Sequence, residues 1–279
     1  MVATPIGNLA DISLRALHVL ALVDAVACED TRHTQTLLRA YGIERSGSEL
    51  IALHQHNEEQ AAVAVVARLQ AGQRVAYASD AGTPGISDPG SRLVAAVRAQ
   101  ALRAVPVPGA SSVTAALSVA GVRPVTGQDD GTFVFAGFLP NKAGERSAAV
   151  ASLAQERRSV VLLEAPHRIE ALAEALAPLG ARSITVGREL TKQFEEIATM
   201  ACQDFQTWLG ADSNRARGEF VLVLHAAEQL PSIAKEFETL RLLLAELPVK
   251  TAVRLACEIS GGSRNALYEA ALAMKRETP

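Results

Sequence analysis

Aromatic residues are scarce in this chain. They make up only 4% of its 279 residues, so aliphatic side chains on helices and strands must build the core. The three cysteines, Cys28, Cys202 and Cys257, are odd in number and far apart, which fits neither a disulfide framework nor the spacing of a metal site. We therefore expect reduced thiols, as in cytoplasmic proteins, and no bound metal.

Long apolar runs and a targeting sequence are missing as well. No run reaches the ~20 apolar residues that a membrane-spanning helix needs, and the first residues lack the basic stretch and apolar core of a signal peptide. The formal net charge is −3, whereas proteins that bind many phosphates of a nucleic acid are commonly basic. A nucleic-acid partner would thus have to be bound through local groups of cations.

Short aliphatic runs alternate with segments of helical periodicity from the start of the chain. Such repeated strand–helix units predict a parallel sheet covered by helices on both faces. The expected strands are 25–28, 50–53, 75–78 and, weakened by its prolines, 104–107. The expected helices are 14–22 with Asp11 or Ser13 as cap, one ending at 40, one between an Asn57 capping box and Gly72, one capped by Asp88, and 110–120.

The second half of the chain predicts a further α/β domain and a helical tail. The turn-rich stretch 122–131 is typical of a linker, and the Gly261-Gly262 turn in the tail resembles that of a helix-turn-helix. Strands are expected at 133–135, 160–163, 184–186 and 220–224, and helices at 145–155, 167–177, 240–247, 250–259 and 264–274. The expected fold is therefore α/β, with α/β domains at 1–124 and 131–227 and a C-terminal helical domain at 231–279.

Four loops that follow strands carry small and polar residues: 4–8, 28–32, 79–90 and 108–112. Ligands of parallel sheets bind outside the carboxyl ends of the strands. We therefore expect these four loops to gather at one edge of the first sheet.

The loop 79–90, Ser-Asp-Ala-Gly-Thr-Pro-Gly-Ile-Ser-Asp-Pro-Gly, is the most unusual of the four. Its small residues leave room for a flat ligand against the backbone, and Asp80 can accept hydrogen bonds from a ribose or an amine. A capped turn explains Asp88 but not 80–84, so we favour a ligand-binding loop. The segment 108–113 opens a helix with two hydroxyls, which suits a polar ligand and simple N-capping equally well.

The motifs Thr-Pro-Ile-Gly-Asn, Ser-Asp-Ala-Gly-Thr-Pro-Gly and Pro-Gly-Ala-Ser-Ser occur in the same order in the tetrapyrrole methylase superfamily. The chain most closely resembles its branch of bacterial 16S rRNA (cytidine) 2′-O-methyltransferases. Members of that family carry several more strand residues before the first motif, so we expect either that the native start lies upstream of Met1 or that the sequence is trimmed at this end. Further matching segments, which extend the resemblance over nearly the whole chain, are 28–32, 138–140, 164–168, 188–192 and 218–220.

The resemblance implies a class III methyltransferase fold that holds S-adenosylmethionine in a cleft between two α/β domains, where ligand pockets commonly form. It also implies 16S rRNA or the small ribosomal subunit as substrate, a homodimer and a cytoplasmic location. The residues that it assigns to the cofactor are Asp80, Gly82 and Thr83 on the methionine and ribose side, Ser112 and Val113 at the adenosyl portion, Leu163 and Ala165 from the second domain, and Pro5 and Gly7 facing the transfer centre.

A ribose 2′-hydroxyl is a poor nucleophile, so a base would assist the positioning that supplies most of the acceleration. Glu29, Asp30 and His54 are candidates near the expected edge, and Glu29 and Asp30 rank first as catalytic residues. Each also has an ordinary explanation, such as a helix cap for Asp30 and an ion pair for Glu29. Glu164 and Glu189 are further candidates, although each has a nearby arginine as a partner.

Cations on loops are the expected contacts for RNA. Arg32, Lys142, Arg146 and Arg168 are the candidates, although solvated surface charge is the commoner role of such residues. A methyltransferase acting on a tetrapyrrole precursor shares the fold and the cofactor and is the main alternative. A non-catalytic nucleotide-binding module is the second alternative.

Overall fold

The computed structural model describes residues 1–54, 56–122, 132–227 and 233–277. The chain forms two compact units, Met1–Ala227 and Glu228–Pro279. The larger unit holds two sheets and is described below as a first lobe, 1–111, and a second lobe, which comprises α5 (Ser112–Val119) and the residues from 132 on. None of the helices in the described ranges combines the length and the apolarity that crossing a membrane requires.

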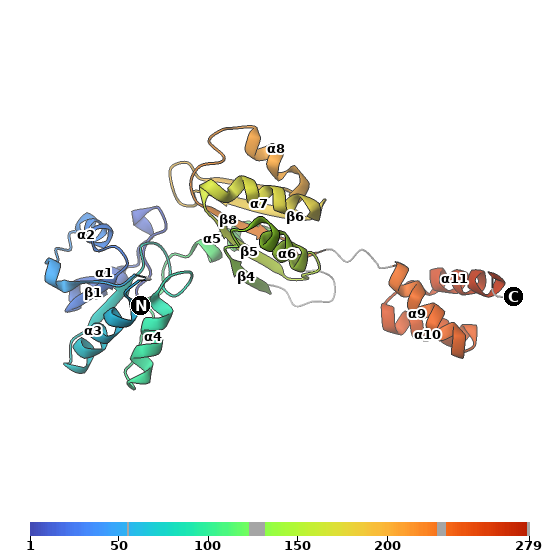
Figure 1. The fold of residues 1–279 in the computed structure, drawn as a ribbon, viewed down its shortest axis with the longest axis horizontal. Helices are drawn as coiled ribbons and strands as arrows, with labels where there is room; N and C mark the ends of the chain where they lie inside the picture. The colour runs from blue at the N-terminus through green and yellow to red at the C-terminus, as the bar shows by residue number, and fades with distance from the viewer. Residues whose placement is uncertain (55, 123–131, 228–232, 278–279) are drawn as a thin grey trace. The chain divides into compact units, whose positions relative to one another are not determined.

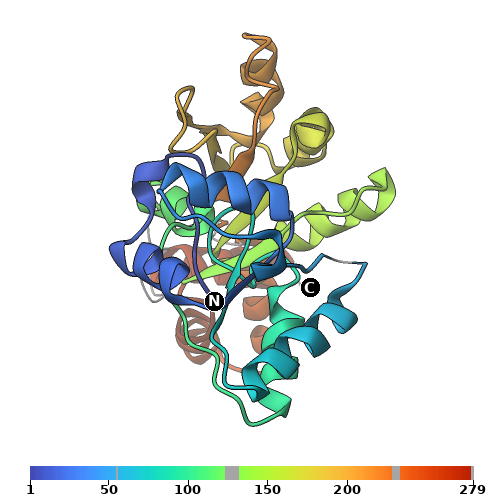
Figure 2. The same ribbon diagram turned by 90° about the vertical axis from the view of Figure 1, so that its left-hand side faces the viewer.

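The first lobe is built on a parallel sheet of three short strands, β1 (Ala25–Cys28), β2 (Leu50–Ala52) and β3 (Val75–Ala78). Their order is β2-β1-β3. The helices α1 (Leu14–Leu22) and α2 (Thr31–Ala40) pack on one face, and α3 (Glu58–Gln70) and α4 (Gly90–Ala99) pack on the other (Figure 2). Burial on both faces explains why these strands are continuous aliphatic runs rather than alternating ones.

The expected strand at 104–107 is wrong. Within this stretch Val107 forms only an isolated bridge to Val2, which itself bridges to Ala78. The prolines at 106 and 108 lack the N–H that a ladder needs. The first residues of the chain thus lie beside β3, where they carry the loop 4–8 to the carboxyl end of the sheet.

The structure decides between the two caps expected for α1 and corrects the cap expected for α3. The side chain of Ser13, not of Asp11, caps α1 by accepting from the amide of Ala16. The expected capping box at Asn57 is wrong, because this side chain instead accepts from the amide of His54 and donates to the carbonyl of Ala52. Asn57 thus fastens the turn between β2 and α3.

The second lobe contains a mixed sheet of order β4-β5-β8-β6-β7, in which only β4 and β5 run parallel. One face is covered by α6, α7 and α8, and the other carries α5 (Figure 1). The strand β7 and the helix α8 were not predicted, and the linker expected at 122–131 lies almost wholly outside the described residues. The elements are α5 (Ser112–Val119), β4 (Phe133–Gly137), α6 (Ala143–Leu153), β5 (Ser159–Glu164), α7 (Ile169–Leu176), β6 (Ser183–Arg188), β7 (Glu196–Ala201), α8 (Phe205–Gly210) and β8 (Phe220–Leu224).

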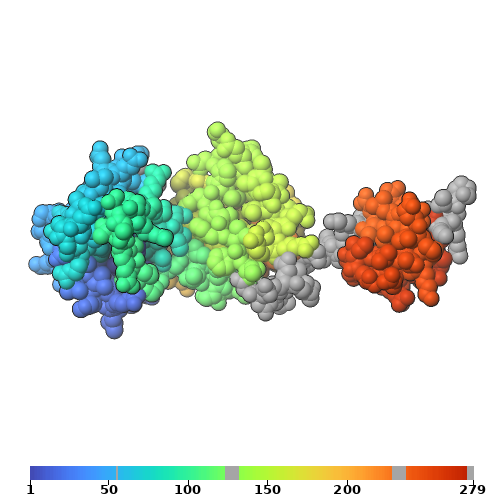
Figure 3. All heavy atoms as spheres, turned by 90° about the horizontal axis from the view of Figure 1, so that it is seen from below, coloured from blue at the N-terminus to red at the C-terminus, as the bar shows by residue number. Residues whose placement is uncertain are grey.

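The smaller unit consists of α9 (Ile233–Glu246), α10 (Val249–Ser260) and α11 (Arg264–Glu277). Apolar residues of all three helices share one core, and in the space-filling view these helices form one orange-to-red body (Figure 3). Gly261 ends α10 in the left-handed conformation, φ 71°, which glycine adopts without the steric penalty of a Cβ. The α10–turn–α11 arrangement confirms the helix-turn-helix pattern expected from the sequence.

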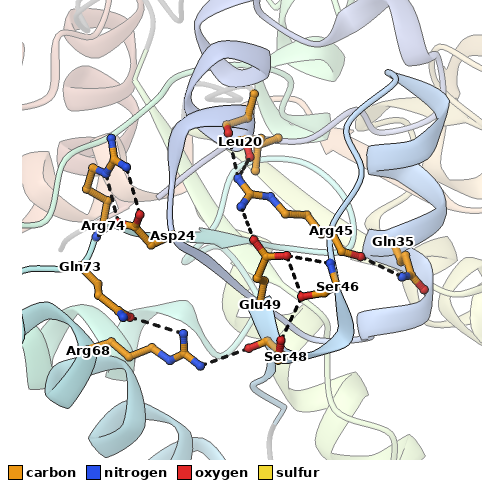
Figure 4. A network of polar contacts seen from close by, with 11 residues as sticks. Leu20, Asp24, Gln35, Arg45, Ser46, Ser48, Glu49, Arg68, Gln73 and Arg74 are labelled. Atoms are coloured by element: carbon orange, nitrogen blue, oxygen red, sulfur yellow. Dashed lines mark hydrogen bonds and ion pairs between the residues drawn. The ribbon is translucent and has the colours of Figure 1, made fainter.

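A network of charged side chains closes the amino end of the first sheet, the side on which its parallel strands begin (Figure 4). Arg45 donates to Leu20 and Ala21 carbonyls at the end of α1 and pairs with Glu49 at 3.0 Å. Arg74 forms a two-pronged pair with Asp24, which directly precedes β1. These pairs join the helix end to the strand starts.

Candidate functional site

The four loops meet at the carboxyl end of the first sheet. Thr4 and Gly82 exchange backbone hydrogen bonds of 3.0 and 3.1 Å, and the amide of Asp30 donates to Asp80 Oδ1 at 3.2 Å. The hydroxyl of Thr83 donates to the Ala110 carbonyl at 2.9 Å. These contacts join all four segments and confirm the expectation that they gather at one edge.

Two carboxylates lie together at this edge without a cation. Glu29 and Asp80 are half-buried, and the Asp80 amide lies 3.5 Å from Glu29 Oε1. Among the described residues, neither carboxylate has an ion-pair partner. Burial, reinforced by the charge of Asp80, raises the pKa of Glu29. The site therefore holds two neighbouring carboxylates that form no ion pair within the described part of the chain.

Asp30 has a structural role that distinguishes it from Glu29. Its carboxylate accepts from the amides of Arg32 and His33 and so caps α2. The bond from the Arg32 amide, together with the Arg32 side chain, lowers the pKa of Asp30. A carboxylate that is capping a helix and is stabilised in its ionised form has little tendency to accept a proton.

Asp88 organises the second half of the loop 79–90. Its carboxylate accepts from the amides of Gly85 and Gly90 at 2.7–2.9 Å, and the Tyr77 hydroxyl lies 3.4 Å from it. The helix α4 begins at Gly90 with Pro89 as its cap residue, one residue later than expected. The carboxylate thus fixes the loop while residues 80–84 stay free of that role.

The helix α5 begins at the Pro-Gly-Ala-Ser-Ser motif. Ser111 is its cap residue, but the Ser111 side chain makes no capping bond, so the simple capping explanation does not hold. Ser112 is half-buried, and Val113 is buried against the second sheet beside Val161 and Val221. The hydroxyl of Ser112 is therefore available to a ligand at the helix start.

The second lobe contributes the segment that follows β5. Leu163 lies in the core between α5 and the second sheet, and Ala165 donates its amide to Glu164 Oε1 at 2.9 Å. Glu164 is buried and pairs with Arg168 at 3.0 Å. One oxygen of Glu164, Oε2, is buried without a hydrogen-bond partner. The predicted cofactor residues Leu163 and Ala165 thus flank a buried carboxylate.

Gly7 brings the two lobes into contact. A Cβ at Gly7 would lie 2.8 Å from Thr191 Oγ1, closer than real Cβ atoms approach. The neighbouring amide of Asn8 donates to the same hydroxyl at 3.1 Å. Only glycine therefore fits against the second-lobe turn 189–192, and Pro5 is buried two residues earlier.

That second-lobe turn is held in an unusual backbone conformation. Glu189 and Thr191 have φ of 50° and 67°, which L residues other than glycine adopt at a steric cost. The ammonium of Lys192 donates to Glu189 at 2.8 Å and to Glu219 at 2.9 Å. Sequence reasoning identified 188–192 as a matching segment but gave no sign of this contact with Gly7.

The four cations proposed for RNA lie in different settings. The side chain of Arg32 is 91% exposed and pairs with Asp30 at 3.4 Å. The side chain of Lys142 is 82% exposed and pairs with Glu145 at 3.1 Å. Arg146 is buried and donates to the Asn141 carbonyl. Arg168 donates to the Leu139 carbonyl as well as pairing with Glu164. Lys142, Arg146 and Arg168 thus lie in or contact the loop 139–142, whereas Arg32 lies on the first lobe.

Comparison with known proteins defines the class. Residues 1–206 match the family described as Tetrapyrrole (Corrin/Porphyrin) Methylases, and residues 237–275 match the RsmI C-terminal HTH domain. A cobalt precorrin-4 methyltransferase superposes with a TM-score of 0.59 at 17% identity, over 80% of this chain and 92% of its own. The larger unit thus has the fold of a tetrapyrrole methylase.

Curated relatives narrow the class further. Ribosomal RNA small subunit methyltransferase I of Escherichia coli O157:H7 is 45% identical over 98% of this chain and 93% of its own. The protein of the same name from Pseudomonas aeruginosa is 46% identical over 98% and 95%. The chain belongs to the family of ribosomal RNA small subunit methyltransferases I, within the tetrapyrrole methylases.

Proposed function

We propose that this protein transfers the methyl group of S-adenosylmethionine to the 2′-hydroxyl of a cytidine in 16S rRNA of the small ribosomal subunit. The similarity to ribosomal RNA small subunit methyltransferases I carries this proposal, because it extends at 41–46% identity over nearly the whole chain. It includes the tail, whose match is to the C-terminal domain of that same family.

The carboxyl end of the first sheet suits this cofactor. S-adenosylmethionine supplies a methyl group on a positively charged sulfur, and its methionine portion carries an ammonium. Glu29 and Asp80 offer negative charge without a cation of the described chain, which complements such a ligand. A uroporphyrin-III C-methyl transferase from Thermus thermophilus, solved with S-adenyl homocysteine, shares the fold with a TM-score of 0.52 at 14% identity, over 80% of this chain and 94% of its own.

The residues that would hold the cofactor come from both lobes. Backbone and hydroxyl groups of small residues allow the ligand to approach closely, and the apolar side chains exclude water around the adenosyl portion. The residues proposed are Pro5, Gly7, Asp80, Gly82 and Thr83 from the loops of the first lobe, Ser112 and Val113 from the start of α5, and Leu163 and Ala165 from the end of β5.

Glu29 is the stronger candidate for the base that accepts the 2′-hydroxyl proton. Its raised pKa lies closer to the working pH than that of an exposed glutamate, which favours proton transfer. Asp30 caps α2 instead, and its backbone amide holds the carboxylate of Asp80. Replacing Glu29 by Gln should lower kcat about 100-fold with a much smaller loss of cofactor affinity; an equal fall in both would remove this role.

Arg32, Lys142, Arg146 and Arg168 are the proposed RNA-facing cations. The exposed Arg32 and Lys142 are suited to direct phosphate contacts, and the inward-turned Arg146 and Arg168 are suited to fixing the loop that carries Lys142. We also propose a homodimer that works in the cytoplasm, where ribosomal subunits are assembled. Sedimentation equilibrium at several concentrations tests the dimer, and a monomer throughout would contradict it.

A ribose-methylation map of rRNA tests the function directly. Alkaline fragmentation stops at 2′-O-methylated nucleotides, so rRNA from cells with and without the gene should differ at one cytidine of 16S rRNA. Purified protein should transfer labelled methyl groups to small subunits from the deletion strain. Transfer to a uroporphyrin or corrin precursor instead, with identical rRNA maps, would favour the tetrapyrrole alternative.

A further inference from the structure

An exposed group of phenylalanines stands on the second lobe beside the ligand loop. Phe133, Phe135 and Phe138 are 43%, 37% and 50% exposed. The chain has only seven phenylalanines, so nearly half of them fall within six residues and are left in contact with solvent. Large aromatic side chains are usually among the first to be buried, which makes this group unusual. We call these three residues the β4 aromatic face.

The first two members lie on the side of the second sheet that carries α5. Val134 and Ala136 pack into the core beneath α6, α7 and α8. Side chains alternate along a strand, so Phe133 and Phe135 point to the opposite side. There α5 packs against β8 in the middle of the sheet, while β4 is the edge strand and keeps its rings uncovered.

A β-bulge brings Phe138 onto the same side. Phe135 pairs with Val161 but Gly137 pairs with Leu162, so one extra residue stands in β4 at this point. Gly137 has φ 63°, the left-handed conformation that such a bulge requires of glycine. The extra residue reverses the alternation, so Phe138 follows onto the side of Phe135. In agreement, Leu139 is buried in the core on the other side.

The bulge lies against the ligand loop of the first lobe. A Cβ at Gly137 would lie 3.7 Å from the ring of Phe135 and 3.9 Å from Ser87 Oγ. Ser87 itself has a left-handed φ of 62°, and its neighbour Ile86 is 40% exposed. The bulge in the aromatic face therefore lies beside the loop 79–90, whose residues 80–83 are proposed to hold the methyl donor. Bulges next to active sites commonly redirect a side chain toward the ligand.

Two cations, Arg168 and Lys142, lie near the Phe138 end of the aromatic face. Arg168 donates to the carbonyl of Leu139 while it pairs with the buried Glu164, which anchors the loop directly after Phe138. Four residues beyond Phe138, Lys142 is 82% exposed. Exposed rings followed by an exposed ammonium are the combination that binds single-stranded nucleic acid, whose bases stack on aromatic side chains and whose phosphates need a cation.

We propose that Phe135 and Phe138 stack against an unpaired base of the substrate RNA next to the methylated ribose, and that Lys142 contacts a phosphate of the same strand. The proposal rests on the rRNA methyltransferase function proposed above. It assigns to the second lobe the selection of an unstacked nucleotide, while the first lobe holds the methyl donor. A nucleotide whose 2′-hydroxyl is to be methylated has to leave regular A-form stacking to enter the site, and aromatic rings stabilise the displaced base.

Paired substitutions separate stacking from mere apolar contact. The double variant Phe135→Leu/Phe138→Leu keeps apolar bulk but removes the rings, and Phe135→Tyr/Phe138→Tyr keeps the rings. Phe194→Leu is the matched control, because Phe194 is 67% exposed and lies outside the aromatic face. KM for small subunits from the deletion strain is measured for each full-length variant, and S-adenosylmethionine affinity is measured by calorimetry.

Loss of the rings should raise KM for subunits about 5- to 100-fold, while the tyrosine variant and the control stay within about threefold of wild type. Cofactor affinity should be unchanged in all of them. A leucine variant that matches the control overturns the proposal. So does a parallel loss of cofactor affinity, which would place adenosine on the rings, or a loss of dimer in sedimentation, which would place a second copy there.

The failure of this proposal is distinct from failure of the proposed function. If the wild-type protein methylates no rRNA, the function itself falls. If the wild type methylates subunits and the leucine variant does so with the same KM, only the stacking role falls.

Discussion

The first sheet has opposite electrostatics at the two ends of its strands. At the amino end, Asp24 and Arg74 pair at 3.0 Å, and Arg45 pairs with Glu49 at the same distance. At the carboxyl end, Glu29 lies beside a second carboxylate without an ion pair among the described residues. The hydrogen bonds from Arg74 lower the pKa of Asp24 to about 2, whereas burial and the neighbouring Asp80 raise the pKa of Glu29.

This difference fits a stabilising role for the charges at the amino end and the cofactor site that we propose at the carboxyl end. Ion pairs and hydrogen bonds at the amino end connect the last carbonyls of α1 to the residues that precede the strands (Figure 4). Burial and the neighbouring Asp80 disfavour the charged form of Glu29 at the carboxyl end, so a cationic ligand bound there would stabilise that carboxylate. Variants at the two ends should therefore separate binding from stability.

The largest effect is expected from Asp80→Asn. The amide retains an acceptor for the Asp30 amide but removes the charge proposed to face the cofactor. Loss of a charged hydrogen bond should weaken S-adenosylmethionine binding about 10- to 100-fold, as measured by calorimetry, without lowering the melting temperature. Asp212→Asn, in an exposed loop, is the control. Normal binding by a destabilised Asp80 variant would reverse the contrast between the two ends.

Arg45→Met should have the converse effect at the amino end. The Arg45 side chain is only 7% exposed and donates to two carbonyls as well as to Glu49. Leaving those acceptors unpaired should lower the free energy of unfolding by about 2–3 kcal/mol, read from urea denaturation. Cofactor affinity well below the transition should equal that of the wild type. The control is Arg98→Met, on the exposed side of α4, which should change neither the free energy of unfolding nor the cofactor affinity. A loss of cofactor binding by the Arg45 variant would contradict the assignment of stability to the amino end and of binding to the carboxyl end.

A third test uses the pH dependence of stability, which should have opposite signs at the two ends. The folded pKa of Glu29 lies above its ordinary 4.5, so the folded state holds an extra proton and stability falls as pH rises from that value. Glu29→Gln removes this loss and should stabilise the protein at pH 7, with the gain vanishing toward pH 4.

The pKa of Asp24 shifts in the other direction, from 3.8 to about 2. Its contribution is present above 3.8 and is lost as pH falls toward 2. Asp24→Asn should therefore destabilise the protein at pH 7, and the difference should shrink with acidification. Urea midpoints of both variants and the wild type from pH 4 to 8 check these signs, and two shifts of the same sign would refute the contrast.

Much of the first lobe could be predicted because its signals are local. Ala25–Cys28 and Val75–Ala78 are short aliphatic runs between polar turns, and both form strands with the expected bounds. The composition of 79–90 favours a ligand loop over a plain turn. A parallel sheet has only one end at which such loops can meet, so the gathering of the four loops followed from topology.

The missed features depend on contacts between distant residues. The edge strand Glu196–Ala201 has a mixed pattern and is defined by its ladder to β6, not by its own composition. The bulge at Gly137 depends on register against β5, which no local pattern reports. The separate roles of Glu29 and Asp30 depend on which carboxylate turns toward the start of α2, a choice that adjacent residues of the same charge do not reveal.

The smallest effect is expected from a pair of glycines with the same backbone angle, one at each end of the sheet. Gly72 and Gly82 both have φ 81°, but a Cβ at Gly72 meets nothing within 4 Å, whereas a Cβ at Gly82 lies 3.2 Å from Ile6 Cγ2. Alanine at either site should cost about 1–2 kcal/mol of backbone strain, measured by urea denaturation. Only Gly82→Ala should also displace Ile6 and the Thr4–Gly82 hydrogen bonds, and so weaken cofactor binding a few-fold. Equal cofactor affinity in the two variants would mean that the loop tolerates the shift and that Gly82 is needed for its backbone angle alone.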